Sequence, residues 1–318
     1  MTTTSAKLLF HSPCFDGIVS AVLTCDYLRT HRCWADVELQ RVNYDVRAEW
    51  TTRRFEGPLA IVDFLFHPDA EFWADHHRTT FLSEDFRRQF ESVGDDRFLY
   101  DACADSCAGL LWRYLGERSQ RNERYADLVA WAEKIDAARY DSVDEAFSFD
   151  QPALQISLSL GAGEDGYCEW LARELSVRTM ADVATLPRVH ARFAARQQQI
   201  DEGLERFRRA ATLSDDIVIY NVDARGTIVS RYAPYRFFPQ ARYSIGYTRG
   251  EEGGKITAMR NPWLDFESVP LGEIFTPFGG GGHQRVASLI VKDHSDAASI
   301  LRRLVEAMEE ADRASIQR

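Results

Sequence analysis

The segment Trp73-Ala74-Asp75-His76-His77-Arg78 places one carboxylate and two imidazoles side by side. Charged and imidazole side chains are uncommon in a packed core, so packing alone does not explain the triplet. A solvated turn with a capping aspartate is the alternative explanation. Because Asp and His are also common metal ligands, the triplet is a candidate metal site.

Three apolar segments elsewhere end on residues of the same chemical kind. They are residues 8–11, which continue into residues 14–17, residues 59–63, and residues 98–101. In an open α/β sheet, the loops that leave the carboxyl ends of parallel strands meet at one crevice. A single strand that ends in Asp is usually a cap or a turn. Taken together, the endings predict a metal site built from five side chains: His11, Asp16, Asp63, His76 and Asp101.

Length and composition indicate a two-domain enzyme-sized protein. The 318 residues are 45% hydrophobic, which is enough to bury a large core. The sequence has no apolar run near the roughly 20 residues that cross a bilayer, and residues 1–7 lack the regions of a signal peptide. The six cysteines show no CxxC spacing, so reduced thiols are expected rather than a disulfide framework. We therefore predict a cytoplasmic protein without a membrane partner.

The formal charge of −11 limits the class of partner. Proteins that coat long nucleic acid do so through a broad basic face that releases counterions from many phosphates, and this balance argues against that mode. Part of the acidity can be local, because carboxylates that bind divalent cations are neutralised by them. Small phosphorylated substrates and short oligonucleotides remain compatible with the sequence. A homodimer is also compatible with it.

The N-terminal part alternates strand and helix patterns. This alternation predicts an α/β fold with a mainly parallel sheet and helices on both faces. The predicted strands are residues 7–11, 37–42, 59–63 and 98–101, and the predicted helices begin at Gly17 or cover residues 84–91 and 106–115. Residues 131–140 also have helical periodicity, and their charges are expected to face solvent.

A long connecting helix and a smaller C-terminal α/β domain are predicted next. Residues 187–211 have Pro near the first turn of a helical pattern. We place a first domain at residues 1–186, the connecting helix at 187–213, and a second domain at 214–318. The second domain is predicted to contain strands at residues 217–221, 227–230, 243–247, 256–259 and 289–291, and a closing helix at 297–311.

The motifs together resemble the DHH phosphoesterase superfamily, which includes RecJ-type exonucleases, nanoRNases, cyclic-dinucleotide phosphodiesterases and family II pyrophosphatases. Its namesake triplet is Asp75-His76-His77, and residues 11–21 are similar to its first motif except at Cys14, where the family usually has aspartate. Asp63 matches the second motif and Asp101 the fourth. Residues 278–288 resemble the glycine-rich signature of the associated DHHA1 domain, although they end in Val-Ala-Ser instead of Ala-Ala-Gly. The resemblance covers nearly the whole chain.

The resemblance implies two Mn²⁺ or Mg²⁺ ions, roughly 3.5 to 4 Å apart, held by carboxylates and imidazoles. Asp63 would bridge the ions and His11 would help to hold one of them. The other ion would be held by Asp16, His76 and Asp101. A metal-activated hydroxide would then attack phosphorus. His77 would contact the substrate phosphate or protonate the leaving oxygen, which makes His77 and Asp63 the implied catalytic residues.

Cys14 is the departure from the family pattern that matters most. As a thiolate ligand it would move the metal preference toward Zn²⁺ or Fe²⁺. As a neutral thiol it would leave one ion with one protein ligand fewer. A small turn residue with no ligand role is the third possibility, and the sequence leaves all three open.

Substrate binding is implied for the glycine-rich segment of the second domain. Its residues Gly280, Gly281, Gly282 and His283 let the backbone approach an anion and direct amide groups at it. A flexible hairpin is the alternative. Arg260 ends a predicted strand and is expected to form a bidentate pair with a phosphate, unless it is an ordinary surface arginine.

These features predict a metal-dependent phosphoesterase that hydrolyses small nucleotides or short oligonucleotides. One alternative is a nucleotide-binding or regulatory protein that has lost turnover, which Cys14 motivates. Another is a polyphosphate or pyrophosphate hydrolase.

Overall fold

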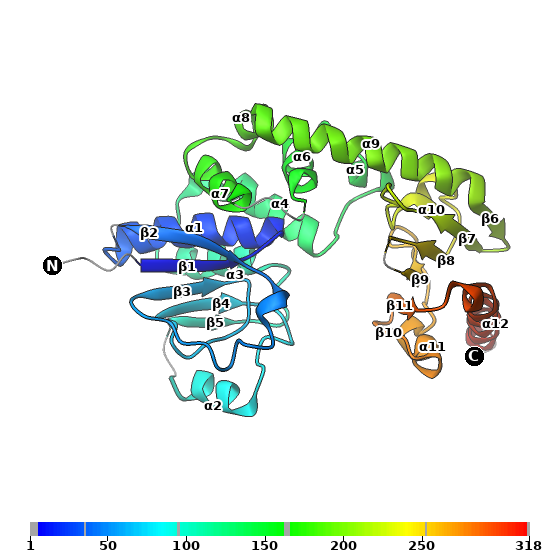
Figure 1. The fold of residues 1–318 in the computed structure, drawn as a ribbon, viewed down its shortest axis with the longest axis horizontal. Coiled ribbons are helices and arrows are strands. Elements are labelled where there is room, and N and C mark those ends of the chain that lie inside the picture. Colours follow the sequence, from blue (N-terminus) through cyan, green and yellow to red (C-terminus); the bar gives the residue numbers. More distant parts are fainter. Residues whose placement is uncertain (1–5, 35, 94–95, 162–165, 252, 317–318) are drawn as a thin grey trace. The chain divides into compact units, whose positions relative to one another are not determined.

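The computed structural model describes residues 6–34, 36–93, 96–161, 166–251 and 253–316, and Figure 1 shows its ribbon. The chain divides into two compact units. The first unit contains residues 1–140 and 149–193, and the second contains residues 141–148 and 194–318. Each unit has hydrophobic core clusters of its own, as expected for separate domains.

The described part of the first unit contains a parallel sheet of five strands in the order β2-β1-β3-β4-β5. The strands are β1 (Ala6–His11), β2 (Val37–Val42), β3 (Leu59–Val62), β4 (Phe72–Asp75) and β5 (Phe98–Tyr100). Every residue of β3 and β4 is buried, which explains why their sequences are continuous apolar runs rather than alternating patterns. Since the strands are parallel, the residues that follow them lie along one edge of the sheet.

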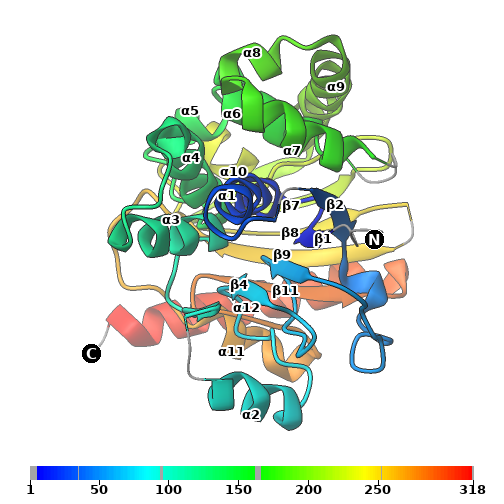
Figure 2. The same ribbon diagram turned by 90° about the vertical axis from the view of Figure 1, so that its left-hand side faces the viewer.

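Helices cover both faces of this sheet, as predicted. One core cluster packs beneath α1 (Phe15–His31), α3 (Cys107–Glu117), α4 (Ala126–Asp136) and α7 (Tyr167–Val177). The cluster on the other face contains Phe86 of α2 (Glu84–Val93) and the aromatic residues Trp50, Phe64 and Phe66. Figures 1 and 2 show α1 and α2 on opposite sides of the sheet. The shorter elements of this unit are η1 (Tyr44–Val46), η2 (Glu123–Tyr125), α6 (Pro152–Ser159) and α8 (Met180–Ala184).

The second unit is built on a mixed sheet whose described strands run in the order β10-β11-β9-β8-β7-β6. Their bounds are β6 (Ala211–Ser214), β7 (Ile217–Asp223), β8 (Tyr243–Arg249), β9 (Gly254–Arg260), β10 (Gly281–Gly282) and β11 (Val286–Val291). Only β7 and β8 pair in parallel among these described strands. One core cluster includes α11 (Leu271–Phe275) and α12 (Ala297–Ile316), and another includes α9 (Pro187–Ala210) and α10 (Ala233–Phe237). The short elements are α5 (Val143–Ala146), η3 (Thr276–Phe278) and η4 (His294–Asp296).

The predicted α/β class, the mainly parallel N-terminal sheet and the long helix are confirmed, but three details of the elements differ. Residues 227–230 do not form the predicted strand, because the N–H of Ile228 donates to the carbonyl of Gln199 in α9 (3.0 Å) rather than to a neighbouring strand. The long helix ends at Ala210, and the next four residues form β6. Strand β4 was not predicted, although it ends in the Asp of the triplet. Within the described residues, no helix is long and apolar enough to cross a membrane.

Candidate metal centre

Three overlapping groups of potential metal ligands lie at the carboxyl edge of the parallel sheet, and the ligand atoms of each group are within 4.8 Å of one another. The thiol group consists of His11, Cys14 and Asp63, and the α4 group consists of Asp16, His76 and Asp136. The triplet group consists of Asp63, Asp75, His76 and His77. Since Asp63 and His76 each belong to two groups, the three form one continuous ligand cluster.

Asp16 is fixed in place by the N-terminus of α3. The residue lies in the first turn of α1 and is 1% exposed. Its carboxylate accepts the backbone N–H groups of Cys107 and Ala108, both at 2.8 Å, and the hydroxyl of Ser106 accepts the next amide, that of Gly109. A carboxylate is favoured at a helix N-terminus, where several amides lack partners within the helix. Asp16 therefore holds the two helices together and keeps a defined orientation.

Gly17 permits the close contact between α1 and the end of β1. A Cβ atom at this position would lie 2.1 Å from the carbonyl oxygen of His11 and 3.1 Å from Oδ2 of Asp63. A larger side chain would therefore push the start of α1 away from β1. The glycine brings Asp16 and His11 to the same edge of the sheet.

Asp63 follows β3 directly and has a left-handed backbone conformation, with φ of 54°. This conformation costs roughly 1–2 kcal/mol for residues other than glycine, and Asp is one of the residues that adopt it most readily. The side chain is 1% exposed, and neither carboxylate oxygen makes a hydrogen bond of ordinary geometry to another described residue. Oδ2 lies 3.5 Å from Nδ1 of His11, and Oδ1 lies 3.6 Å from Nδ1 of His77. Burial, followed by the charge of nearby carboxylates, raises the pKa of Asp63.

His76 presents one ring nitrogen to the carboxylates. Its Nδ1 lies 3.1 Å from the carbonyl oxygen of Ala104, so Nδ1 carries the hydrogen and Nε2 is left with a free lone pair. Nε2 is buried without a hydrogen bond to another described residue. Its nearest carboxylate oxygens belong to Asp136 (3.4 Å), Asp16 (3.7 Å) and Asp63 (3.7 Å). A carbonyl that fixes the tautomer in this way is the usual support of a metal-binding histidine.

Asp75 positions His77. Oδ1 of Asp75 lies 2.8 Å from Nδ1 of His77 and also accepts the backbone N–H of His76 at 2.8 Å. Burial lowers the pKa of His77, but the hydrogen bond to Asp75 and the charges of Asp75 and other carboxylates outweigh burial, so the pKa is raised. The His77 ring therefore holds its proton more firmly than an ordinary histidine does. Its side chain is 34% exposed, which leaves it accessible to a ligand.

The thiol group contains two ligands that are neutral in the metal-free protein. Burial, followed by the charge of His77, lowers the pKa of His11 to about 4. The His11 ring packs edge-on against Tyr44 (5.1 Å between centroids) and is stacked with Phe64 (6.0 Å). Burial, followed by the charge of Asp63, raises the pKa of the Cys14 thiol well above its usual value. Without a cation, Cys14 is therefore a thiol rather than a thiolate.

The structure brings Asp136, and not Asp101, into the ligand cluster. The Asp101 carboxylate accepts the N–H of Cys103 at 2.9 Å and lies 3.3 Å from the guanidinium of Arg113, and its side chain is 42% exposed. Asp136 is the last residue of α4 and contributes a carboxylate to the α4 group. The expectation that the charges of residues 131–140 face solvent is therefore corrected at Asp136.

The sequence contains a signal for Asp136 that was missed. Leu128, Ala132 and Asp136 are spaced by four residues, so they share one face of the helix. Leu128 and Ala132 on that face are buried. A carboxylate that continues a buried apolar stripe requires a partner, because an isolated buried charge is costly.

In the second unit, the glycine-rich segment forms a hairpin. Gly281 and Gly282 make up β10 and pair with β11. The amides of Gly280 and His283 already donate to backbone carbonyl groups, so they do not point at an anion as expected. At Gly282, φ is 155°, and a Cβ atom would lie 2.3 Å from the carbonyl oxygen of Val286. A tight hairpin therefore accounts for this glycine, and His283 lies exposed at its tip.

Arg260, at the end of β9, is not a surface arginine. It is 7% exposed, and its guanidinium donates to the carbonyl oxygens of Asn261 (3.3 Å) and Phe266 (2.7 Å). The group also lies 4.2 Å from the centroid of the Phe266 ring. Burial, followed by the charge of Arg285, lowers its pKa. Among the described residues, no carboxylate pairs with it within 4.0 Å. A buried guanidinium of this kind is suited to an anionic ligand.

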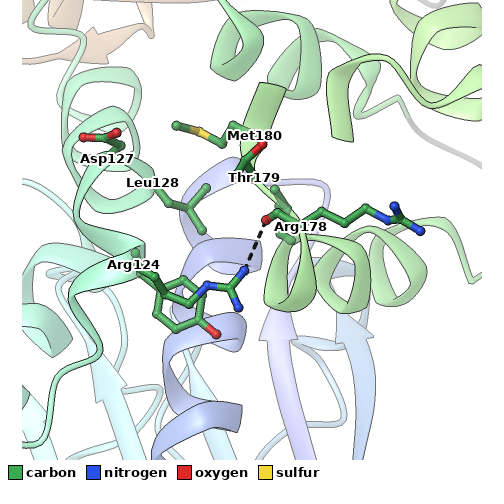
Figure 3. Close-up of a pocket in the computed structure, with 8 residues that line it drawn as sticks. Arg124, Asp127, Leu128, Arg178, Thr179 and Met180 are labelled. Carbon is green, nitrogen blue, oxygen red and sulfur yellow. Dashed lines mark hydrogen bonds between the residues drawn. The ribbon is translucent and has the colours of Figure 1, made fainter. Parts of the chain in front are cut away.

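A separate cavity of about 160 Å³ lies in the first unit, and Figure 3 shows the residues that line it. Arg124 donates to the carbonyl oxygen of Arg178 across this cavity. Asp127 is the one carboxylate in the described lining, so this is not a second metal site. Asp127 lies in the first turn of α4, roughly 13 Å along the helix axis from Asp136.

No protein-family model matches the sequence, and no curated protein matches it. Solved structures do share its fold. The pGpG-specific phosphodiesterase PggH from Vibrio cholerae has a TM-score of 0.74 at 17% identity, with coverage of 96% of this chain and 99% of that chain. RecJ from Thermus thermophilus in complex with Mn²⁺ has a TM-score of 0.58 at 14% identity, and the match covers 97% of this chain and 52% of the RecJ chain.

A DHH domain described as a member of the s1p family of ribosomal proteins has a TM-score of 0.58 at 12% identity, with coverage of 96% of this chain and 86% of that chain. At such low identities the likeness concerns the fold. The motif-based resemblance is confirmed at that level: with Asp75-His76-His77 at the end of β4, this chain has the fold of the DHH phosphoesterase superfamily.

Proposed function

We propose that this protein is a metal-dependent phosphoesterase that hydrolyses the phosphodiester bond of a short oligonucleotide, with a linear dinucleotide as the preferred substrate. The observation that carries the proposal is the ligand cluster, in which the triplet group joins the thiol group through Asp63 and the α4 group through His76, and His77 lies beside Asp63.

The residues of the cluster fit divalent cations. Four of their potential ligand atoms are buried and make no hydrogen bond of ordinary geometry to a described residue: Nδ1 of His11, both carboxylate oxygens of Asp63, and Nε2 of His76. Buried polar atoms without partners are costly and usually indicate a missing water or ion. Carboxylates and imidazoles suit Mn²⁺ or Mg²⁺. RecJ, which shares the fold, has been solved with Mn²⁺.

We assign one ion to the thiol group and one to the α4 group, with Asp63 serving both. Two divalent cations bound there would supply a nucleophile at neutral pH and neutralise charge on the phosphoryl oxygens. Asp75 keeps His77 in one orientation through its hydrogen bond to Nδ1. The other ring nitrogen of His77 then donates its proton to a phosphoryl oxygen or to the leaving oxygen.

Binding of a substrate phosphate is assigned to the second unit. Arg260 is a buried guanidinium whose partners are backbone carbonyls, and His283 is exposed at the tip of the hairpin. Both side chains offer N–H donors to a phosphate. In this proposal the metal-binding domain is residues 1–186, the connecting segment is 187–213 and the substrate-binding domain is 214–318; the compact units divide the connecting helix at residue 194.

The substrate class rests on charge and on fold. A net charge of −11 does not favour long nucleic acid. PggH, whose chain is matched over 99% of its length, is a pGpG-specific phosphodiesterase. A linear dinucleotide is therefore the first substrate to test.

The test is an assay of the full chain after chelation and after return of Mn²⁺, Mg²⁺ or Ca²⁺. Substrates are pGpG, short RNA, cyclic dinucleotides, 3′,5′-bisphosphorylated adenosine, and polyphosphate. We expect Mn²⁺-dependent cleavage of pGpG to mononucleotides and the weakest support from Ca²⁺, which prefers more ligands at longer distances. Full turnover after chelation would contradict the proposal. Nucleotide binding without turnover at saturating Mn²⁺ would instead favour the regulatory alternative that Cys14 motivates.

A further inference from the structure

A polar cavity adjoins the ligand cluster on the side of β2. Its volume is about 270 Å³, just below the roughly 300–1,000 Å³ typical of small-molecule sites. It is lined by Ser12, Gln40, Arg41, Val42, Asn43, Asp45, Val46 and Arg53. None of these residues belongs to the ligand cluster.

The cavity is joined to His11 by short, ordered connections. Ser12 follows His11 directly, and its N–H donates to the carbonyl of Val42 at the end of β2 (2.9 Å). Asn43 Oδ1 accepts the N–H of Tyr44 at 2.7 Å, and the Tyr44 ring packs against His11. A ligand in the cavity would thus lie beside the thiol group.

Three side chains of the lining, those of Ser12, Asp45 and Arg53, offer polar groups to a ligand. Asp45 and Arg53 have opposite charges and line the same cavity, yet neither forms an ion pair within 4.0 Å with a described residue. The Arg53 guanidinium lies 5.6 Å from the centroid of the Phe55 ring. Ser12 is 2% exposed, and its hydroxyl makes no hydrogen bond of ordinary geometry to a described residue.

Asp45 bears on the kind of ligand, because it would repel a phosphate that the two arginines of the lining, Arg41 and Arg53, would attract. A neutral planar group with donors on one edge and acceptors on another would satisfy Asp45 and Arg53 together. A nucleobase has this character.

We infer that the cavity binds a guanine base of the substrate, with Arg53 donating to O6 and N7 and Asp45 accepting from the N2 amino group. This inference rests on the proposed function. Arginine is the usual partner of guanine O6 and N7, and the N2 amino group is a donor that adenine lacks. Adenine would instead present an amino group to Arg53, so the cavity discriminates against it.

The kinetic test compares kcat/KM for pGpG and pApA on the same Mn²⁺-loaded protein, so that metal content and folding cancel in the ratio. We expect the parent to prefer pGpG by about 10- to 100-fold, the scale of one good bidentate base contact. Asp45→Asn and Arg53→Ala should each move the ratio toward one. Glu56→Gln and Arg47→Ala are matched controls, because these exposed residues do not line the cavity, and they should keep the parent's ratio. A parent ratio near one, or a ratio unchanged by both cavity variants, would overturn the inference.

A binding test separates this inference from the proposed function. The affinities of the full chain for GMP and AMP are measured in the presence of a chelator, where no turnover occurs. Preference for GMP that is lost in Asp45→Asn supports the guanine site even if no dinucleotide is hydrolysed in the assay above. Equal affinity for GMP and AMP overturns the guanine site even if hydrolysis is found.

Discussion

The thiol group and the α4 group lie at the same edge of one sheet, but their ligands are fixed by different means. In the α4 group, Asp16 accepts two amides of α3, and His76 is tied to the carbonyl of Ala104. In the thiol group, His11 is held by aromatic packing, and Cys14 makes no side-chain cap for α1. Preorganised ligands bind metal more tightly than ligands that must first be oriented.

Because of this difference, we expect the two proposed metal positions to differ in affinity. The α4 group offers two carboxylates and one imidazole, which suits Mn²⁺ or Mg²⁺. The thiol group offers one carboxylate, one imidazole and a thiol whose pKa is raised by burial. We therefore expect the α4 group to fill first and the thiol group to limit activity when metal is scarce.

The largest effect is expected at Asp63, the residue that the thiol group shares with the rest of the cluster. Asp63→Asn keeps a residue that tolerates the left-handed backbone but removes the charge. We expect kcat/KM to fall by at least about a thousandfold, or about 4 kcal/mol of barrier. Bound Mn²⁺ per chain should fall with it. A variant within about tenfold of the parent would show that Asp63 does not serve both ions.

The structure places Asp136 in the ligand cluster, whereas the sequence motif implies Asp101, and substitutions at the two positions test which one binds metal. Asp136→Asn should lower Mn²⁺ affinity and kcat/KM by about 10- to 100-fold, the scale on which metal-site neighbours act. Asp101→Asn is the matched control and should stay within about threefold, because surface charges have small effects. If Asp101→Asn lowered Mn²⁺ affinity and kcat/KM as much as Asp136→Asn, or more, Asp101 would be a metal ligand. The measurements are metal titration and steady-state kinetics.

Asp75→Asn tests whether His77 acts as a proton donor. The variant leaves the partial burial of His77 unchanged but removes the charge of its hydrogen-bond partner, so the pKa of His77 should fall. If the protonated ring is the active form, the alkaline limb of the kcat profile should move to lower pH. We expect kcat at neutral pH to fall by about 100-fold or less, within the range of general acid catalysis. Loss of activity with an unmoved limb would indicate a structural role only.

Metal-dependent stability should vary with pH. Burial, followed by the charge of Asp136, raises the pKa of Asp16 to about 6, whereas an unfolded aspartate titrates near 3.9. The metal-free fold therefore loses stability as pH rises from about 4 to about 6, because the unfolded chain releases the proton more easily. Cations compete with this proton, so the rise in Tm on adding Mn²⁺ should be larger at pH 7.5 than at pH 5. At about 100 times Kd, the gain is about 2.7 kcal/mol. Equal shifts at both pH values would contradict this.

The smallest effect on activity is expected from Cys14→Asp, which gives the thiol group a second carboxylate, as the α4 group has. Cys14→Asp supplies a hard oxygen ligand and should raise activity at limiting Mn²⁺, with a gain that shrinks at saturation. If Cys14 binds metal as a thiolate, the change should instead move preference from Zn²⁺ or Fe²⁺ toward Mn²⁺. A variant identical to the parent in affinity, preference and rate would place position 14 outside the coordination sphere.

Much of the site was predictable because parallel strands end at a common edge. The structure brings His11, Asp16, Asp63 and His76 together there, as the strand endings predicted. Asp101 is the exception among these endings. It follows β5, the edge strand, whose residues are only half-buried, and its carboxylate faces Arg113 instead.

The remaining differences have physical causes that a local pattern does not contain. Asp136 lies at the end of a helix, so the argument from strand endings did not predict it. Strand β4 has only four residues, too few for a clear periodicity. Residues 227–230 have strand-like composition, but the N–H of Ile228 bonds to α9. For Asp136 and Ile228, a tertiary contact decided the outcome.

The capping of α3 by Asp16 also sets the order in which the centre is assembled during synthesis. The two amides that Asp16 accepts belong to residues 91 and 92 positions later in the chain, and Asp136 follows Asp16 by 120 positions (136 minus 16). The β1–α1 loop thus leaves the ribosome long before its partners. A nascent chain that stops short of α3 exposes Asp16 to water, with neither the helix nor the complete α4 group available. The proposed metal binding therefore requires the complete α4 group, which forms only when the first unit folds as a whole domain.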